Sequence, residues 1–460
     1  MVKNNSIDDV LKKIITLINK NDLKIAEKET KKALEKFPNN HLFFDLMGSI
    51  SIKKNEINNS IKFYQKALSI NSNFIGSILN LGVAFQKLGK DEEALLNFRS
   101  ALKKNPKLIN AYNNIGFILN RQGKYNEAIS NLKKATEIDP SAAEIYLNMG
   151  ISYQNLENYE DAISNYKTAL ALRNNFYDVY FNLGEIYKKI KDYKRSLEYF
   201  LKSKHRKTNE KILECLFLLN LKTEYSDLIN NLEKKDPNNR GIAAVSSYFS
   251  QQFSVKNTYS FCPNPMDFIL KTNLIENFKD FESFLNNLFE EILKQDFVWE
   301  PYARTTNKGF ATKGNLSELN LSYIKILERY LSEEIEKYRE NFKEKKIGFI
   351  NAWPKNYSYM MWSNRLKKEG FNKSHIHPSG WLSGVFYLRI PKKIKNDEAG
   401  IEFSTHGGDF EIKKNNIPKK ILTPQVGDLV MFPSSLYHKT IPFESDEERV
   451  CIAFDIIKID

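Results

Sequence analysis

The stretch INAYNNIGFILNRQGKYNEAISNLKKATEIDPSA, residues 109–142, is one copy of a segment that the first half of the chain repeats. Glycine returns every 34 residues, at Gly48, Gly82, Gly116, Gly150 and Gly184. Alanine keeps the same period in the second half of each copy, at Ala33, Ala67, Ala101, Ala135 and Ala169, and Ser203 continues the series. A fixed period of this length predicts stacked two-helix units.

One buried face can be read within the quoted copy. Tyr112, Ile115, Gly116 and Leu119 stand at i, i+3, i+4 and i+7, which is one stripe of a helix. Glycine there lets the second helix cross closely, and a proline such as Pro140 ends the pair. We therefore expect an α-solenoid over residues 1–210, in units 7–40, 41–74, 75–108, 109–142, 143–176 and 177–210, with a less regular helical cap and connector over 211–256.

The period and its markers resemble the tetratricopeptide repeat. Asparagine stands two residues before the glycine in four consecutive units, at Asn80, Asn114, Asn148 and Asn182. This position lies off the buried stripe, so we expect it on the concave surface, where stacked amides could bind an extended peptide. The arrangement resembles the asparagine ladder of O-linked N-acetylglucosamine transferase, which grips protein substrates. The alternative is a solvated polar position in an asparagine-rich chain.

Composition narrows the class of protein. A chain of 460 residues exceeds one ordinary core, and 42% hydrophobic with 27% charged residues is globular. The net charge of +13 comes from scattered lysines, so we expect no nucleic-acid partner. Three widely spaced cysteines form no CxxC pair, which favours a reducing compartment. The N-terminus lacks the apolar core of a signal peptide, and no apolar run reaches the ~18 residues of a membrane span. We expect a cytoplasmic protein with no membrane contact.

The pattern changes from about Tyr259 onward. Residues 275–296 and 318–346 still predict helices, which would flank a β-rich region. Strand-like segments then dominate: IGFINAW (347–353), YSYMMWSN (357–364), LSGVFYLRI (382–390), GIEFST (400–405), DLVMFP (428–433) and VCIAFDII (450–457). Many short strands beside flanking helices predict a β-sandwich or barrel-like domain over residues 257–460.

Histidines mark a candidate site in this second half. The chain has 6 histidines, and His375 and His377 form a near pair that His438 follows 61 residues later. Positions i and i+2 of a strand share a face, so the pair should project together. Arg449 begins the final strand and shares a face with Cys451, which leaves room for a bound carboxylate beside the cation. The same alternation places Val385, Tyr387 and Arg389 on one face.

Longer strings around these residues carry a second resemblance. HIHPSGWLSGVFYL (375–388), GDLVMFPSSLYH (427–438) and ERVCIAF (448–454), with WSN (362–364) and FATKGNL (310–316), resemble a bacterial and phage branch of the iron(II)/2-oxoglutarate-dependent oxygenases. The resemblance implies a double-stranded β-helix (jelly-roll) core. In that superfamily a His-x-Asp/Glu pair and a distal histidine hold Fe(II), and a later arginine binds the 2-oxoglutarate cosubstrate. It thus assigns metal binding to His375 and His438, and cosubstrate binding to Arg449 and Tyr387; for Tyr387 the alternative is an ordinary core tyrosine.

His377 departs from that pattern, because the superfamily usually has a carboxylate there. One interpretation is a three-histidine site in which His377 binds the metal directly. The other makes His377 an outer hydrogen-bond donor, with water or a carboxylate such as Glu402 or Asp409 completing the site.

The two resemblances together predict a multidomain enzyme. We expect an Fe(II)- and 2-oxoglutarate-dependent dioxygenase, a hydroxylase that uses molecular oxygen on a polypeptide held in the repeat groove. A catalytically inactive repeat scaffold is one alternative. A small-molecule oxygenase that uses its repeats only for assembly is another.

Overall fold

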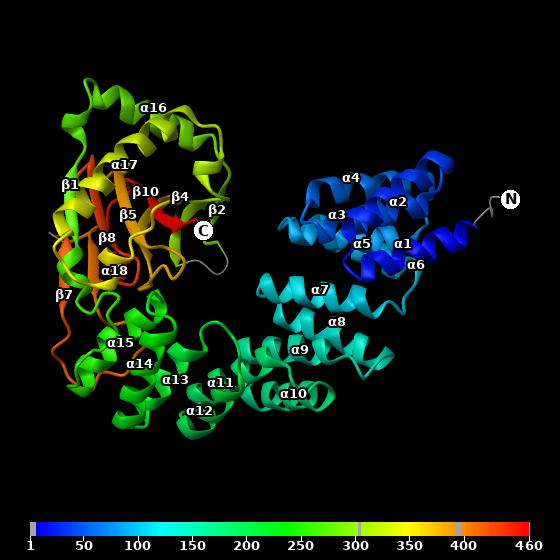
Figure 1. The fold of residues 1–460 in the computed structure, drawn as a ribbon, viewed down its shortest axis with the longest axis horizontal. Helices are drawn as coiled ribbons and strands as arrows, with labels where there is room; N and C mark the ends of the chain where they lie inside the picture. The colour runs from blue at the N-terminus through cyan, green and yellow to red at the C-terminus, as the bar shows by residue number, and fades with distance from the viewer. Residues whose placement is uncertain (1–5, 302–304, 392–396, 460) are drawn as a thin grey trace. The chain divides into compact units, whose positions relative to one another are not determined.

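The computed structural model describes residues 6–301, 305–391 and 397–459. The chain divides by packing into two compact units, Met1–Ile186 and Tyr187–Asp460, each with its own core. Figure 1 shows the first unit as helices only, whereas the second combines helices with the strands of the chain.

The repeat region consists of helices that pair as the 34-residue period predicts. Their bounds are α1 (Ile7–Asn19), α2 (Leu23–Lys36), α3 (His41–Lys53), α4 (Ile57–Ile70), α5 (Ile75–Lys87), α6 (Asp91–Lys104), α7 (Ile109–Arg121), α8 (Tyr125–Ile138), α9 (Ala143–Asn155), α10 (Tyr159–Leu172), α11 (Tyr177–Lys189) and α12 (Tyr193–Lys202). The predicted tetratricopeptide solenoid is confirmed, and Figure 1 shows its helices from blue to cyan-green.

Close crossing of helices explains the periodic glycines. A Cβ on Gly116 would lie 2.6 Å from Leu132 Cγ, and one on Gly150 would lie 2.4 Å from Tyr166 Cε1. Real Cβ contacts are not this short, so the second helix of each unit occupies the space that a side chain would need. Ala135 lies on α8 and is fully buried, as expected for its place in the period. The repeat pattern is therefore a packing requirement at these points.

Further helices and all strands belong to the second unit. The helices are α13 (Thr208–Leu218), α14 (Lys222–Lys235), α15 (Arg240–Phe253), α16 (Phe281–Leu293), α17 (Ser322–Phe342) and α18 (Gly348–Asn351), with short 3-10 turns at Pro265–Phe268, Ile275–Asn277 and Leu316–Glu318. The strands are β1 (Leu270–Asn273), β2 (Phe297–Trp299), β3 (Thr306–Thr312), β4 (Tyr357–Asn372), β5 (Leu382–Arg389), β6 (Ile401–Ser404), β7 (Lys419–Leu422), β8 (Asp428–Pro433), β9 (Tyr437–Thr440) and β10 (Arg449–Lys458). Among the described residues, no helix is both long and apolar enough to cross a membrane.

The strands form two antiparallel sheets. The larger has the order β1-β8-β5-β10-β4-β3-β2, and the smaller has the order β7-β6-β9, to which His375 adds an isolated bridge with His438. Along the chain, β4 and β5 belong to the larger sheet, β6 and β7 to the smaller one, and β8, β9 and β10 then alternate between the two. Apolar residues of both sheets meet between them, among them Val385, Phe403 and Phe432.

Helices α16 and α17 cover the opposite face of the larger sheet. Ser332 of α17 hydrogen-bonds the Tyr359 hydroxyl at 2.8 Å, and the guanidinium carbon of Arg389 lies 3.5 Å from the ring centroid of Phe289 in α16. The predicted flanking helices are thus confirmed, although both are shorter than expected. The prediction that Arg389 shares a face with Tyr387 is wrong. A bulge pairs Val450 with Arg389 but Cys451 with Tyr387, which turns Arg389 to the helix side.

The segment IGFINAW, predicted as a strand, forms the short helix α18 instead. Its first amides are held by another chain segment: Gly348 N donates to Ser260 O at 3.0 Å and Phe349 N to Phe261 O at 2.7 Å. Phe349 is fully buried among aromatic rings. A short apolar run fits a buried helical turn as well as a strand, and periodicity alone does not separate the two.

The connector helices α13–α15 pack onto the sheet domain within the second unit. The Tyr248 hydroxyl donates to Glu411 O at 2.9 Å, and Gln252 Nε2 donates to Lys414 O at 3.1 Å. The Tyr248 and Phe410 rings stack at 5.4 Å. The packing boundary at residues 186–187 therefore falls earlier than the repeat boundary expected at residue 210.

Candidate metal centre and cosubstrate pocket

Three histidines converge at one end of the space between the sheets. The backbone of His375 exchanges two hydrogen bonds of 3.1 Å with that of His438, and His377 N donates to Ser434 O at 2.9 Å. These bonds fix the extended segment so that one ligand nitrogen from each ring lies within 4.8 Å of the others. No carboxylate or thiol of the described residues joins this cluster. The near pair projects together as expected, although His375 forms only an isolated bridge and His377 lies outside the strands of the described residues.

Each histidine has its Nδ1 engaged away from the cluster centre. Nδ1 of His375 lies 2.7 Å, and that of His438 3.1 Å, from the backbone carbonyl two residues earlier. Nδ1 of His377 lies 2.6 Å from Asp455 Oδ1. Since these acceptors require an N–H at Nδ1, the lone pair of each neutral ring is on Nε2. A donor set of three imidazole lone pairs suits iron, zinc, copper or nickel.

Burial favours the neutral form of two of the three histidines, His375 and His438. Desolvation, helped by the neighbouring His377, lowers the pKa of His375 to about 3. Desolvation and the other two rings lower the pKa of His438 well below its usual value. Metals bind the neutral imidazole, so His375 and His438 do not have to release protons near neutral pH before they bind one.

The two carboxylates considered as alternative ligands lie elsewhere. Phe403 pairs with His438 in the smaller sheet, and Glu402 pairs with Lys439. Because neighbouring residues of a strand face opposite ways, Glu402 lies on the far side, where its carboxylate is 3.2 Å from Lys439 Nζ. Asp409 is also outside the histidine cluster. Neither of the two therefore completes the site in this structure.

Arg449 is buried beside the histidines without an acidic partner. It is 2% exposed, its Nε donates to Ala399 O at 3.0 Å, and its Nη1 lies 3.5 Å from Cys451 Sγ. No acidic side chain of the described residues forms an ion pair with it. A buried cation without a counter-ion is costly, and an anionic ligand would remove that cost.

A cavity of about 640 Å³ joins the histidines to Arg449. Its volume is in the usual range for small-molecule sites. Polar lining comes from Thr306, Asn364, Asn372 and Thr440, whereas Met360, Trp362 and Ile457 supply apolar surface. Lys207, from the loop before α13, also lines it. The segment between α12 and α13 thus contributes to the wall of the candidate site.

Several buried polar atoms around the cavity have no partner. Asn364 Oδ1, Asn372 Oδ1 and the Tyr387 hydroxyl are buried without a hydrogen bond. The Tyr387 ring lies under Arg449, with the guanidinium carbon 4.9 Å from its centroid, and burial raises the tyrosine pKa above its usual value. Buried polar groups are normally paired, so these atoms fit a polar ligand better than an empty core. Tyr387 is next to Arg449, although it is not part of the cavity lining.

Asp455 was not predicted as a site residue from the sequence, although strand alternation could have indicated it. Arg449, Cys451 and Ala453 were placed on one strand face, and the next position of that face is Asp455. In the structure all four line the cavity. Sequence reasoning also missed Arg240 of α15, whose Nε donates to Pro378 O at 3.0 Å, because nothing local links α15 to that loop.

The asparagine ladder is largely engaged in contacts between repeats. Asn80 Nδ2 donates to Asp45 Oδ1 at 3.2 Å, and the Asn182 side chain lies near the Tyr166 hydroxyl, which donates to Gln154 Oε1 at 2.8 Å. Asn148 is 7% exposed, and its Nδ2 donates to Asn113 Oδ1 at 2.9 Å. Asn114 is half-buried, and no hydrogen bond of its side chain occurs in the described part of the chain. Peptide binding by these four residues remains a prediction.

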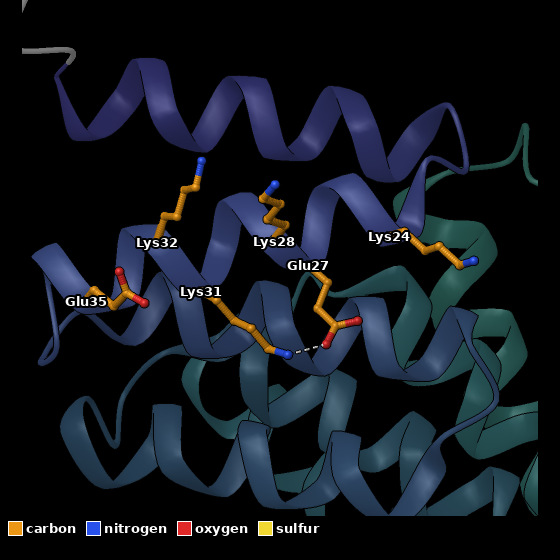
Figure 2. Close-up of a pocket in the computed structure, with 6 residues that line it drawn as sticks. All are labelled: Lys24, Glu27, Lys28, Lys31, Lys32 and Glu35. Carbon is orange, nitrogen blue, oxygen red and sulfur yellow. Dashed lines mark hydrogen bonds and ion pairs between the residues drawn. The ribbon is translucent and has the colours of Figure 1, made fainter.

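A second hollow lies on the surface of α2. Figure 2 shows its lining, which is Lys24, Glu27, Lys28, Lys31, Lys32 and Glu35. Lys31 pairs with Glu27 at 2.6 Å, and Glu27 also pairs with Lys54 at 3.0 Å. One of these ion pairs joins residues four apart on α2, and the other joins α2 to Lys54. Exposed ion pairs of this kind are common on protein surfaces and contribute little to stability. The residues that line this hollow do not indicate a catalytic or metal-binding site.

Comparison with protein families assigns both halves of the chain. The model of the family described as "Putative 2OG-Fe(II) oxygenase" matches residues 360–455, which include His375, His438 and Arg449. Tetratricopeptide-repeat models match residues 44–74, 77–107, 97–130, 118–157 and 141–204. The chain therefore combines tetratricopeptide repeats with a domain of the 2OG-Fe(II) oxygenase type, as predicted. No curated protein matches the chain.

Solved structures with similarity to the chain include tetratricopeptide-repeat proteins. A tetratricopeptide repeat protein from Parabacteroides merdae shares 18% identity over 53% of this chain and 92% of its own, with a TM-score of 0.40. PilF of Pseudomonas aeruginosa shares 17% identity over 47% of this chain and 96% of its own, with a TM-score of 0.39. YrrB, described as a TPR protein with an unusual peptide-binding site, shares 19% identity over 42% of this chain and 97% of its own, with a TM-score of 0.34.

Proposed function

We propose that this protein is an Fe(II)- and 2-oxoglutarate-dependent dioxygenase that hydroxylates a polypeptide recruited by its repeats. One observation carries the proposal: three imidazoles with free Nε2 atoms and a buried, unpaired Arg449 line the same cavity. The donor set fits iron, and the buried guanidinium of Arg449 fits a carboxylate of a dicarboxylate cosubstrate. Bound Fe(II) with 2-oxoglutarate and oxygen supplies an oxidant that can attack an unactivated C–H bond.

In this proposal, residues of the chain would bind and orient the metal and the cosubstrate. His375, His377 and His438 would hold the metal through Nε2. Arg449 would pair with a carboxylate of 2-oxoglutarate, since no acidic side chain of the described residues forms an ion pair with its buried guanidinium. The Tyr387 ring lies under Arg449 and would support the guanidinium, and its unpartnered hydroxyl would reach the same carboxylate only if the cosubstrate extended beyond the cavity lining. Apolar surface from Trp362 and the surrounding sheets excludes water.

Anaerobic binding tests this proposal directly. Purified apoprotein is titrated with Fe(II), and then with 2-oxoglutarate in the presence and absence of the metal. We expect one metal per chain and 2-oxoglutarate binding that depends on it, with both lost in His375→Ala and His438→Ala. A protein that takes up no stoichiometric metal would support the alternative, an inactive repeat scaffold.

Recruitment of a polypeptide rests on the repeats. Tetratricopeptide repeats generally bind proteins or peptides, and Asn114 keeps an amide free for that purpose on the face predicted to be concave. A peptide substrate should lose affinity in Asn114→Ala while 2-oxoglutarate affinity stays the same. Unchanged turnover of every substrate by repeat variants would favour the small-molecule oxygenase, in which the repeats serve only assembly.

The proposed compartment is the cytoplasm. The three cysteines, Cys215, Cys262 and Cys451, are buried and free, which agrees with a reducing environment. Fe(II) is also the oxidation state that such an environment favours. Labelling of intact cells with a thiol reagent that cannot cross membranes, followed by recovery of the protein, would test this location.

A further inference from the structure

We propose that Asp455 is a positioning residue that acts on the metal through His377 and supplies the negative charge that a direct carboxylate ligand would otherwise bring. The inference rests on the proposed function, because it assumes that the three histidines bind a metal. Asp455 and His377 both lie within the matched region 360–455, but neither the description of that family nor the histidine cluster assigns a role to Asp455.

The contacts of Asp455 form a closed polar network. Asp455 Oδ1 accepts from His377 Nδ1 at 2.6 Å and from Ser383 Oγ at 2.6 Å. Ser383 Oγ lies 2.8 Å from Ser434 Oγ, and Ser434 O accepts the His377 amide at 2.9 Å. The ring and the backbone of His377 are thus held by the same group of residues. Such a network leaves the imidazole one orientation and one tautomer, with Nε2 toward the other histidines.

The sheet provides this network with a rigid base. Asp455 is 6% exposed and pairs with Ser383 across β10 and β5, so the carboxylate and the hydroxyl face the same way. Gly380 makes room for them, since a Cβ there would lie 2.9 Å from Asp455 Cγ and 2.6 Å from Ser434 Oγ. No cation of the described residues pairs with Asp455; its one ion-pair contact is with His377. The carboxylate is therefore dedicated to the histidine.

The chemical consequence concerns charge at the metal. A carboxylate that accepts from Nδ1 increases the electron density at Nε2 and makes the imidazole a stronger ligand. In a site with two histidines and one carboxylate, the negative charge is on a ligand atom. Here the third ligand position is His377, and the carboxylate of Asp455 lies one hydrogen bond further out. His375 and His438 use backbone carbonyls instead, so His377 alone receives a full charge.

Metal affinity of the full-length protein tests the proposal with a signal that does not need turnover. Co(II) is titrated anaerobically into apoprotein and followed by its visible absorption. We expect Asp455→Asn to weaken Co(II) binding by about 10- to 100-fold, because the amide keeps the shape but loses the charge. Asp428→Asn is the matched control: Asp428 is 2% exposed and accepts from Lys271 and Asn273 outside the cavity. We expect its Co(II) affinity to equal that of the wild type, even if its thermal stability falls.

The same Asp455→Asn change, made in a His377→Asp protein, distinguishes a positioning role of Asp455 from a general effect on stability. In His377→Asp a carboxylate takes the third ligand position, and Asp455 loses its partner and becomes a like charge nearby. We therefore expect Asp455→Asn to leave Co(II) affinity unchanged or improve it in this background, the reverse of its effect in the wild type. A purely structural role would weaken binding equally in both backgrounds and would overturn the inference. Equal Co(II) affinities of wild type and Asp455→Asn overturn the inference alone, whereas absence of Co(II) binding by the wild type overturns the proposed function as well.

Discussion

The repeat unit and the sheet unit use their polar side chains in different ways. In the repeats, asparagines such as Asn80 and Asn148 bond to residues one repeat away, Asp45 and Asn113, and the same relation can recur along the solenoid. In the sheet unit, His375 is linked to His438 and His377 to Asp455, across long stretches of chain, and each link occurs once. Loss of one contact in the repeats should therefore affect only the neighbouring repeats, whereas loss of one contact in the site should affect the proposed metal binding.

The largest effect is expected from the site itself. His438→Ala removes one of the three proposed metal ligands, and His375 and His377 are then left without the third imidazole. Fe(II) affinity should therefore fall by more than about 100-fold. Equilibrium dialysis of iron measures this. The repeat unit should melt as before, because its core is separate. If His438→Ala retained stoichiometric iron, the histidine cluster would not be the metal site.

Arg449 should show opposite effects on stability and on binding. Arg449→Met removes a buried cation without a counter-ion, so the apoprotein should gain about 1–3 kcal/mol in its free energy of unfolding. The same change should weaken 2-oxoglutarate binding by about 2–5 kcal/mol, roughly 30-fold or more. Chemical denaturation and calorimetric titration measure the two quantities. Arg365→Met is the control, since Arg365 pairs with Glu448 at 2.9 Å and should only lose stability.

A repeat glycine should affect stability without touching the site. Gly116→Ala places a Cβ 2.6 Å from Leu132 Cγ, so we expect a loss of about 1–3 kcal/mol in the repeat unit. Iron affinity should not change. Adding Leu132→Ala should restore part of the loss, because it removes the atom that clashes. A loss in the double variant equal to the sum of the two single losses would show that the close crossing is not the cause.

Arg240 joins helical and sheet parts of the second unit and should have an intermediate effect. Its Nε donates to Pro378 O at 3.0 Å, next to His377, and loss of this charge-assisted bond in Arg240→Gln should weaken iron binding about tenfold, or about 1.5 kcal/mol. Gln251→Ala is the control on the same helix, because Gln251 donates to Asn416 O at 3.0 Å, away from the histidines. Equal iron affinities of the two variants would contradict a role for α15 in the site.

The smallest effects should distinguish two residues of the ladder. Asn148→Ala breaks a buried bond to Asn113 and should cost about 1 kcal/mol of stability. Asn114→Ala breaks no such bond and should change stability by less than about 0.5 kcal/mol. Thermal unfolding measures both. A peptide that binds the repeats should instead respond to Asn114→Ala, and a ladder in which both variants behave alike would not fit the structure.

These differences explain which predictions succeeded. The helix pairs followed from the period, because each buried stripe contacts a helix only a few residues away and neighbouring units repeat the contact. The near pair of histidines followed from strand alternation, which is also local. The run 347–353 was misread because its partners are Ser260 and Phe261, which no local pattern reveals. Arg389 was misplaced because one extra residue in β5 reverses the alternation beyond it.

Short-range patterns in the chain were enough to predict the solenoid, the β-rich second half and the histidine–arginine set, since each is written in local spacing or in a recognisable motif. How the site is completed depends instead on the tertiary structure. It placed Glu402 on the far face of its strand, brought Asp455 to His377, and left Arg449 buried without a counter-ion. These facts depend on strand register and on contacts between distant segments, and a shift of one residue in register exchanges the two faces of a strand.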